Sequence, residues 1–177
     1  MEQKVKVNNY VSLIGTVFSG PTFNHQLHGE TYYLFTLEVT RSSENVDRIP
    51  IMISSNLLNV NIGDRCKVTG HYRSHNLKDD DKQRLILSVF AKDIYKIVDE
   101  HEEDKNLIIL EGFIGKEPSY RETPLGKEIT ELLVAVNRPY KKSDYIPCIT
   151  WGKNARTSAY LKVGTPIRIV GRVQSRE

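Results

Sequence analysis

The sequence has 177 residues, and 39% of them are hydrophobic, which is enough to build the core of one large domain or of two small ones. No apolar run approaches the roughly 18 residues of a membrane span, and the N-terminus lacks the apolar stretch of a secretion signal. The net charge of +3 is unevenly divided, because residues 1–98 carry +2, residues 99–105 carry −4 and residues 106–177 carry +5. We therefore expect a globular, cytoplasmic protein with no membrane partner, whose second half suits a polyanionic partner.

An internal repeat divides the chain. A shift of 97 residues pairs identical residues, among them Leu13 with Leu110, Gly15 with Gly112, Val39 with Val136, Arg41 with Arg138, Asp47 with Asp144 and Pro50 with Pro147. After a four-residue insertion the shift becomes 101, which pairs Gly63 with Gly164, Gly70 with Gly171 and Ser74 with Ser175. Two copies of one fold explain this pattern. We expect a first domain at 1–98, an acidic, exposed linker at 99–105 and a second domain at 106–177.

The first copy predicts strands rather than helices, because β-branched and aromatic residues fall in short runs separated by Gly, Pro, Asn and Asp. Residues 55–61 stand where the second copy has a helical pattern, but their own pattern is degraded. A strand through residues 71–75 is followed by a polar loop at 76–83 and by a last strand at 84–97.

The second copy predicts strands at 107–116, 128–137 and 144–151, a short helix at 154–161 with Asn154 as a possible N-cap, and a fourth strand at 166–174. This is the order of an OB barrel, a small five-stranded Greek-key barrel that binds oligonucleotides, without its last strand. We expect an all-β protein of two tandem OB barrels, the second lacking its last strand, each with at most one short helix. An open edge leaves backbone groups unpaired, so we expect either a truncated chain or a partner that fills the gap.

No catalytic or metal-binding pattern is evident. The sequence has no phosphate-binding glycine loop, no nucleophile elbow and no convincing carboxylate pair, and its histidines lack the cysteines or carboxylates that would complete a metal site. Cys66 and Cys148 lie in apolar runs, as expected of two buried thiols in a reducing compartment. We expect a protein that is not an enzyme and needs no metal or cofactor.

Four motifs of the second copy resemble the bacterial single-stranded DNA-binding protein family in its two-barrel form: 118–126 (PSYRETPLG), 136–138 (VNR), 145–153 (YIPCITWGK) and 171–176 (GRVQSR). The resemblance implies OB barrels that bind single-stranded DNA with little sequence preference in replication, repair, recombination or mobile-element transfer. It further implies a homodimer presenting four barrels, replication or repair proteins as further partners, and a bacterial protein associated with the nucleoid or encoded by a mobile element.

The sequence also departs from the family pattern. Family members usually end in a flexible tail with an acidic, hydrophobic tip that recruits other enzymes, and no such segment is recognisable here. The first copy has Ser54 where the second has Trp151. The alternative is therefore a scaffold or dimerisation protein of a replication complex, with a weakened DNA surface.

Binding without sequence preference needs aromatic faces for base stacking and cations for phosphates. Trp151 is the expected platform, at a position where the resemblance implies base stacking, although it could be a core residue. Tyr120 could be a packed strand end, and single cations are often only solvated surface. The expected site in the second copy comprises Trp151, Tyr120, Arg121, Arg138, Lys153, Arg156, Arg172 and Arg176. A secondary set in the first copy comprises Arg41, Phe23, Tyr33, Tyr72 and Arg73.

Overall fold

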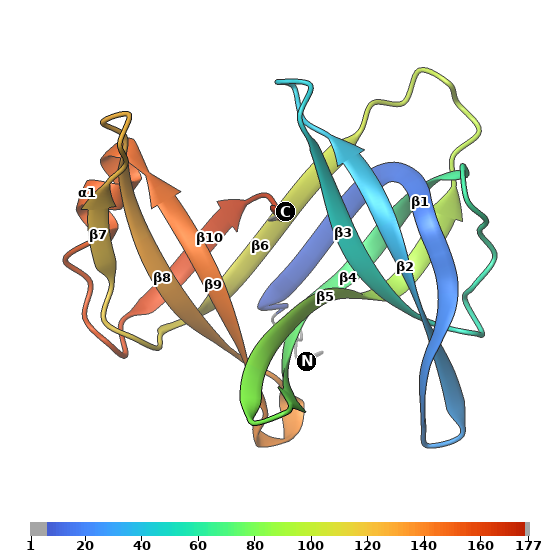
Figure 1. Cartoon of the computed structure of the whole chain (residues 1–177), viewed down its shortest axis with the longest axis horizontal. Helices are drawn as coiled ribbons and strands as arrows, with labels where there is room; N and C mark the ends of the chain where they lie inside the picture. The colour runs from blue at the N-terminus through green and yellow to red at the C-terminus, as the bar shows by residue number, and fades with distance from the viewer. Residues whose placement is uncertain (1–6, 176–177) are drawn as a thin grey trace, which may run out of the picture.

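The structure is a computed structural model that describes residues 7–175, and its regular elements are almost all strands (Figure 1). The first barrel consists of β1 (Asn9–Leu27), β2 (Glu30–Thr40), β3 (Val46–Ser54), β4 (Arg65–Asp79) and β5 (Lys82–Lys96). Antiparallel pairing joins β3 to β2, β2 to β1, β1 to β4 and β4 to β5. A short parallel pairing between β3 and β5 closes the barrel.

The core of this barrel follows the two-residue period of a strand. Along β3, Asp47, Ile49, Ile51 and Ile53 are completely buried, while Arg48 on the other face is exposed. Every second residue of β3 thus contributes its side chain to the core of the first barrel.

The second barrel repeats this order as far as the described residues extend. It consists of β6 (Lys105–Ile114), β7 (Ser119–Glu122), β8 (Glu128–Asn137), the 3-10 turn η1 (Pro139–Lys141), β9 (Ser143–Trp151), α1 (Gly152–Ser158) and β10 (Pro166–Gly171). Up to Ser175, no strand follows β10, so nothing in the described chain takes the place that β5 has in the first barrel.

The open edge leaves part of the second core exposed. Ile51 and Val68 in the first barrel are 0% exposed, whereas Cys148 and Ile169, at the repeat-equivalent positions, are only partly buried. Burial nevertheless raises the pKa of the Cys148 thiol to about 12. Burial together with the nearby Asp64 carboxylate raises the pKa of the Cys66 thiol to about 11, and both cysteines are free.

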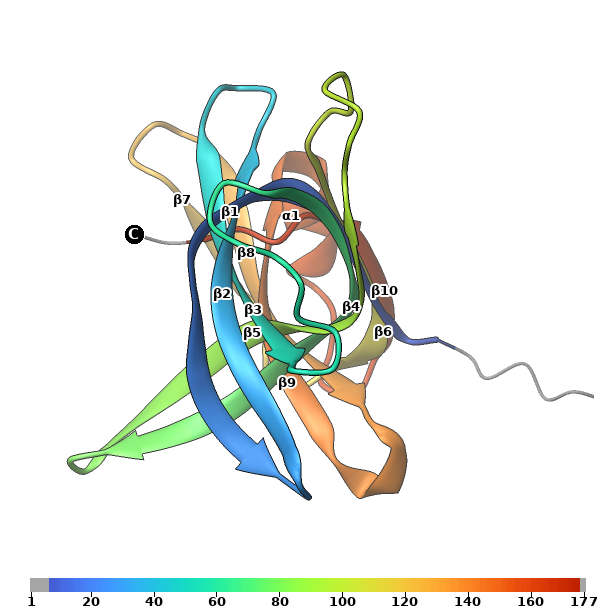
Figure 2. The same cartoon turned by 90° about the vertical axis from the view of Figure 1, so that its right-hand side faces the viewer.

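One continuous sheet joins the two barrels. Strands β1 and β6 pair antiparallel, with Val11 opposite Ile108, and these are equivalent strands of the two copies. Figure 2 shows the first barrel in front of the second, with the β1–β2 and β4–β5 hairpins extending past the barrel body. The repeat in the sequence thus corresponds to two barrels placed back to back across β1 and β6.

Several predicted boundaries were wrong. The polar loop expected at 76–83 is mostly strand, because β4 and β5 continue their pairing as far as Asp79 and Lys82. The helix begins at Gly152 rather than after Asn154, since Gly152 adopts a φ of +58° that turns the chain directly out of β9. The last strand ends at Gly171, three residues before the expected end.

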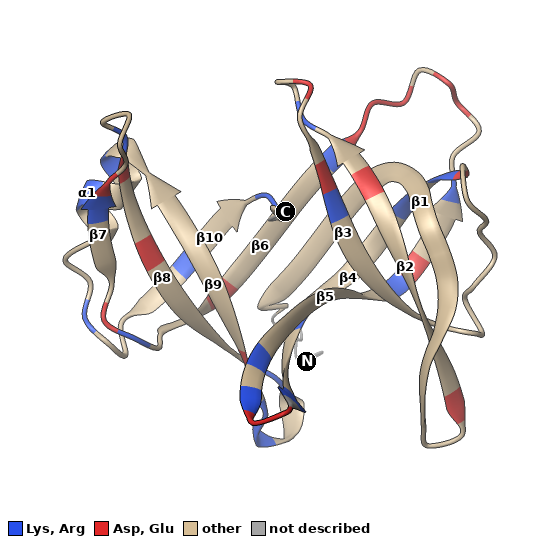
Figure 3. Ribbon diagram, viewed as in Figure 1, with Lys and Arg blue, Asp and Glu red and all other residues tan. Residues whose placement is uncertain are grey.

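The acidic linker is bound to the first barrel at its end. The Asp104 carboxylate accepts hydrogen bonds from the Arg65 guanidinium at 2.7 Å and from the Thr40 backbone N–H at 2.8 Å. Figure 3 shows the acidic residues of this segment along the loop that precedes β6. No helix among residues 7–175 is long and apolar enough to cross a bilayer.

Candidate nucleic-acid interface

Trp151 lies at the end of β9 on the outer face of the second barrel. Along β9 the side chains of Asp144 and Ile146 are buried, whereas Tyr145 and Trp151 are each 47% exposed, as the alternation of a strand requires. Half of the indole is therefore available to a base. Tyr145 shares this face and was missed in the sequence, although the same alternation would have indicated it.

A row of three side chains crosses the sheet at Trp151. Trp151 is opposite Ile129 on β8, and Ile129 is opposite Arg121 on β7. Directly paired residues point to the same side of a sheet, so Trp151 and Arg121 share a face, with the buried Ile129 between them. We call these three residues the Trp151 row. Its ends are two strand spacings apart, roughly 10 Å.

Tyr120 faces the other side of the sheet. It is paired with Thr130, whose hydroxyl donates a 2.7 Å hydrogen bond to the carbonyl of Ala155 in α1. Partial burial and a hydrogen bond to Glu128 raise the pKa of the Tyr120 hydroxyl. The structure therefore does not bring Tyr120 and Trp151 together on one stacking surface, although Tyr120 is 43% exposed.

The helix α1 directly follows Trp151 and carries two cations (Figure 3). Its contacts with Thr130 and Thr150 put it on the side of the sheet that Tyr120 faces, opposite the Trp151 row. Ala155 and Ser158 are its buried residues, and a 2.7 Å hydrogen bond between the hydroxyls of Ser158 and Thr150 holds it against β9. Lys153 and Arg156 are exposed. Arg156 forms an ion pair with Glu128, whereas Lys153 makes no ion pair with any residue that the structure describes.

Arg138 has a structural position instead. Its guanidinium forms a bidentate ion pair with the buried Asp144 carboxylate and also donates to the carbonyl of Ser74 in the first barrel at 3.3 Å. The hydrogen bonds that Arg138 donates to the Asp144 carboxylate raise the pKa of Arg138. Arg41 is bound in the same way to Asp47. The charges of both arginines are thus paired with buried carboxylates of the same chain.

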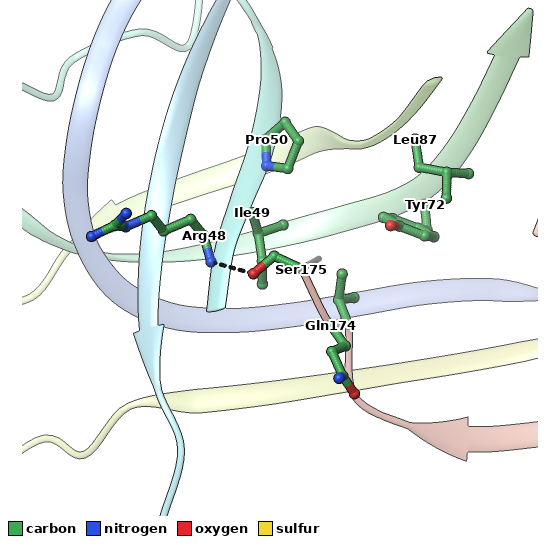
Figure 4. A pocket seen from close by; sticks show the side chains of 8 residues that line it. Arg48, Ile49, Pro50, Tyr72, Leu87, Gln174 and Ser175 are labelled. Atoms are coloured by element: carbon green, nitrogen blue, oxygen red, sulfur yellow. Dashed lines mark hydrogen bonds between the residues drawn. The ribbon is translucent and has the colours of Figure 1, made fainter. Parts of the chain in front are cut away.

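The remaining predicted residues are dispersed. Arg172 is exposed just after β10, and Arg176 lies outside the described residues. Tyr72 is only 9% exposed and belongs to the core, where burial raises its pKa to about 12, so its ring cannot serve as an open platform in this structure. Figure 4 shows Tyr72 and Leu87 beside the cavity at the seam between the barrels.

The aromatic residues of the first copy's hairpin pair with each other. Phe23 on β1 is 62% exposed and meets Tyr33 on β2 edge-to-face, with ring centroids 6.3 Å apart. Arg73 on β4 lies over the ring of Phe90 on β5, 4.3 Å from its centroid. Phe90 was not predicted, because its neighbours come from other strands. Among the described residues, no group of three or more His, Cys, Asp or Glu side chains could hold a metal ion.

Known proteins resemble this chain in both sequence and fold. The model of the Single-strand binding protein family matches residues 105–177. Single-stranded DNA-binding protein 3 of Listeria innocua is 38% identical over 78 residues, covering 40% of this chain and 49% of that protein. The single-stranded DNA-binding protein of Halalkalibacterium halodurans is 36% identical over 78 residues, covering 40% of this chain and 46% of that protein.

The chain spans about half the length of these curated relatives. The crystal structure of the wild-type single-stranded DNA binding protein from Thermus aquaticus has a TM-score of 0.78 at 21% identity, covering 94% of this chain and 84% of that one. This likeness extends over both barrels and shows the two-barrel OB fold. The sequence similarity to the single-strand binding protein family thus covers the part of the chain that contains the second barrel.

Proposed function

We propose that this chain binds single-stranded DNA with little sequence preference and without catalysis, in replication, repair, recombination or mobile-element transfer. The observation that carries the proposal is the half-exposed Trp151 at the end of β9, in a row with Arg121 and within the segment matched by the family model. Every base offers a stacking face, whereas the four bases share few hydrogen-bonding groups. A lone indole beside cations therefore suits binding that ignores sequence.

Each residue of this surface has a distinct proposed task. Trp151 stacks on a base, which contributes about 1–3 kcal/mol. Arg121, in the Trp151 row, and Lys153, two residues after Trp151 in the chain, neutralise phosphates. Arg121 forms an ion pair with Glu131 at 3.6 Å, and both side chains are about half exposed. Solvent weakens this pair, so a phosphate can replace the carboxylate.

We also propose that two copies associate through the outer face of the sheet that joins the barrels, giving four barrels. Three side chains on this face, Tyr10, Phe113 and Val170, are 38%, 42% and 57% exposed. Light scattering over a range of concentrations tests this, and a monomer throughout contradicts it.

The binding proposal is tested with a labelled mixed-sequence single strand. Fluorescence anisotropy across a salt series compares wild type with Trp151→Ala, and Tyr160→Ala, which removes an 86% exposed ring outside the row, is the control. We expect single strands to be preferred over duplex, a tenfold or larger loss for Trp151→Ala, and little change for the control. The log of the binding constant should fall with log salt by about 0.7 per phosphate contacted.

The alternative function is a scaffold whose DNA surface has weakened. The ion pairs of Arg121 with Glu131 and of Arg156 with Glu128 favour it, because they compensate part of the positive charge of the second barrel. No binding of single-stranded DNA by the folded wild-type chain at low salt would decide for the scaffold.

A further inference from the structure

The first barrel has aromatic residues on the same face as the Trp151 row, but on different strands. Ser54 occupies the repeat position of Trp151, and Tyr32 occupies that of Ile129. Tyr32 and Ser54 are directly paired across β2 and β3, just as Ile129 and Trp151 are paired across β8 and β9. In the first barrel the aromatic ring of this pair is thus on β2, whereas in the second barrel it is on β9, the strand equivalent to β3. Both rings lie on the same face of their barrels.

Strand β5 extends this aromatic surface. Phe90 is paired with Met52 across the parallel β3–β5 contact, so it lies on the outer face, while the neighbouring Val89 is completely buried. The rings of Tyr32 and Phe90 are 5.6 Å apart. On the other side, His25 stacks on Tyr32 at 4.9 Å with an interplanar angle of 13°. His25, Tyr32 and Phe90 form a continuous strip, which we call the first-barrel strip. Tyr32, only 9% exposed, supports the two outer rings from below, whereas Phe90 is partly exposed.

Two cations cover the strip. The Arg73 guanidinium lies 4.3 Å and the Lys92 ammonium 5.6 Å from the Phe90 ring centroid. Neither forms an ion pair with a carboxylate among the described residues, in contrast to Arg41 and Arg138. Their positive charge is therefore available to a ligand.

The neighbouring carboxylate is already engaged. Glu30 accepts 2.8 Å hydrogen bonds from the hydroxyls of Tyr32 and Ser54, and these bonds hold the Tyr32 ring in place. A single strand offers base faces and phosphates at short, regular intervals, which matches an aromatic strip covered by unpaired cations.

We propose that the first barrel has its own single-stranded DNA site, in which a base stacks on Phe90 while Arg73 and Lys92 turn outward to the flanking phosphates. This inference rests on the proposed function and extends it to a barrel that lacks the tryptophan. It also replaces Tyr72 by Phe90 as the aromatic platform of that barrel.

The single tryptophan makes the two barrels distinguishable, because Trp151 fluorescence reports on the second barrel alone. The probe is an oligothymidylate of about 8 nucleotides, within the range that one OB barrel occupies. Titration calorimetry counts the oligonucleotides bound per chain, while Trp151 quenching follows the second site. The variants are Phe90→Ala and the milder Lys92→Gln. Tyr95→Ala, which removes a 59% exposed ring on the same strand but outside the strip, is the control.

We expect about two oligonucleotides per wild-type and Tyr95→Ala chain, and about one per Phe90→Ala chain, with unchanged Trp151 quenching. Lys92→Gln, which keeps the ring, should retain the second count at roughly threefold to tenfold weaker affinity. Equal stoichiometry and affinity in wild type, Phe90→Ala and Lys92→Gln would overturn the inference while leaving the proposed function intact. If wild type binds no oligonucleotide and shows no quenching, it is the proposed function that fails. Circular dichroism at the titration temperature confirms that each variant is folded.

Discussion

Ser74 and Asp144 belong to different barrels, and the backbone N–H of Ser74 donates a 2.9 Å hydrogen bond to Oδ1 of Asp144. Their repeat equivalents make the same contact from the second barrel to the first: the backbone N–H of Ser175 donates to Oδ1 of Asp47 at 3.2 Å. The hydroxyls of both serines also accept hydrogen bonds from backbone N–H groups of the opposite barrel. The Ser74 hydroxyl accepts from Tyr145, and the Ser175 hydroxyl accepts from Arg48, as Figure 4 shows. These reciprocal contacts fix the two barrels relative to each other and use motifs that the sequence suggested for DNA.

Loss of the Asp144 charge should destabilise the whole chain. Asp144 is 1% exposed and is bound by the Arg138 guanidinium and the Ser74 backbone N–H. Removing one partner of a buried pair leaves the other uncompensated, so Asp144→Asn should lower the free energy of unfolding by about 3 kcal/mol. Urea titration measures this. Glu131→Gln breaks an exposed pair and should cost less than about 1 kcal/mol; similar losses in both variants would refute the role assigned to Asp144.

Substitutions of Lys153 and Arg138 should have different effects: the first should alter DNA binding and the second should alter stability. Lys153 is exposed and free of ion pairs with described residues, so Lys153→Gln should reduce the log-salt slope of DNA binding by about 0.7 and leave the melting temperature unchanged. Arg138→Gln should instead lower the melting temperature, since it breaks the pair with Asp144, with the salt slope retained. The paired measurements are anisotropy and thermal unfolding. A change of slope in Arg138→Gln alone would place the phosphate contact at Arg138.

How far the sequence predicts this surface can be judged from particular residues. Period-two alternation places Trp151 outward on β9, and the predicted bounds of β8 match the structure. The side on which Tyr120 lies depends on the register of β7 against β8, which no local pattern contains. The partners of Arg138 and Phe90 come from other strands and from the other barrel, so the ion pair and the aromatic strip depend on the closed fold. Identical residues such as Arg41 and Arg138 indicated the repeat, but not that both arginines form ion pairs with buried aspartates.

His71 should make stability depend on pH near neutrality. Burial lowers the pKa of its imidazole, and the nearby Arg73 and Lys92 charges add to this, against the raising effects of the Asn9 carbonyl and of Asp144. Nδ1–H donates to that carbonyl at 2.7 Å. The unfolded chain therefore binds the proton more readily, so stability should fall as pH drops below about 6.5 toward the lower folded pKa. Urea midpoints from pH 5.5 to about 8 test this. His71→Gln should flatten the dependence, and His75→Gln, an exposed position on the same strand, should not; equal curves for His71→Gln and wild type would exclude the assignment.

Gly70 and Gly171 are equivalent residues of the two copies, but only Gly70 lies against β5. Substitutions at the two positions therefore test how the presence of β5 affects stability. A Cβ at Gly70 would lie 2.0 Å from the carbonyl oxygen of Phe90 on β5, whereas at Gly171 it would meet nothing within 4 Å. Neither glycine has the positive φ that would itself disfavour alanine. Gly70→Ala must therefore displace the backbone of β5 and should cost about 2 kcal/mol or more, while Gly171→Ala should change the free energy of unfolding by less than about 0.5 kcal/mol. Because the clash falls on Phe90, Gly70→Ala should weaken oligonucleotide binding to the first barrel. Binding to the second barrel, which Trp151 quenching follows, should change less. Equal stability losses at the two positions would show that a strand occupies the open edge of the second barrel in solution.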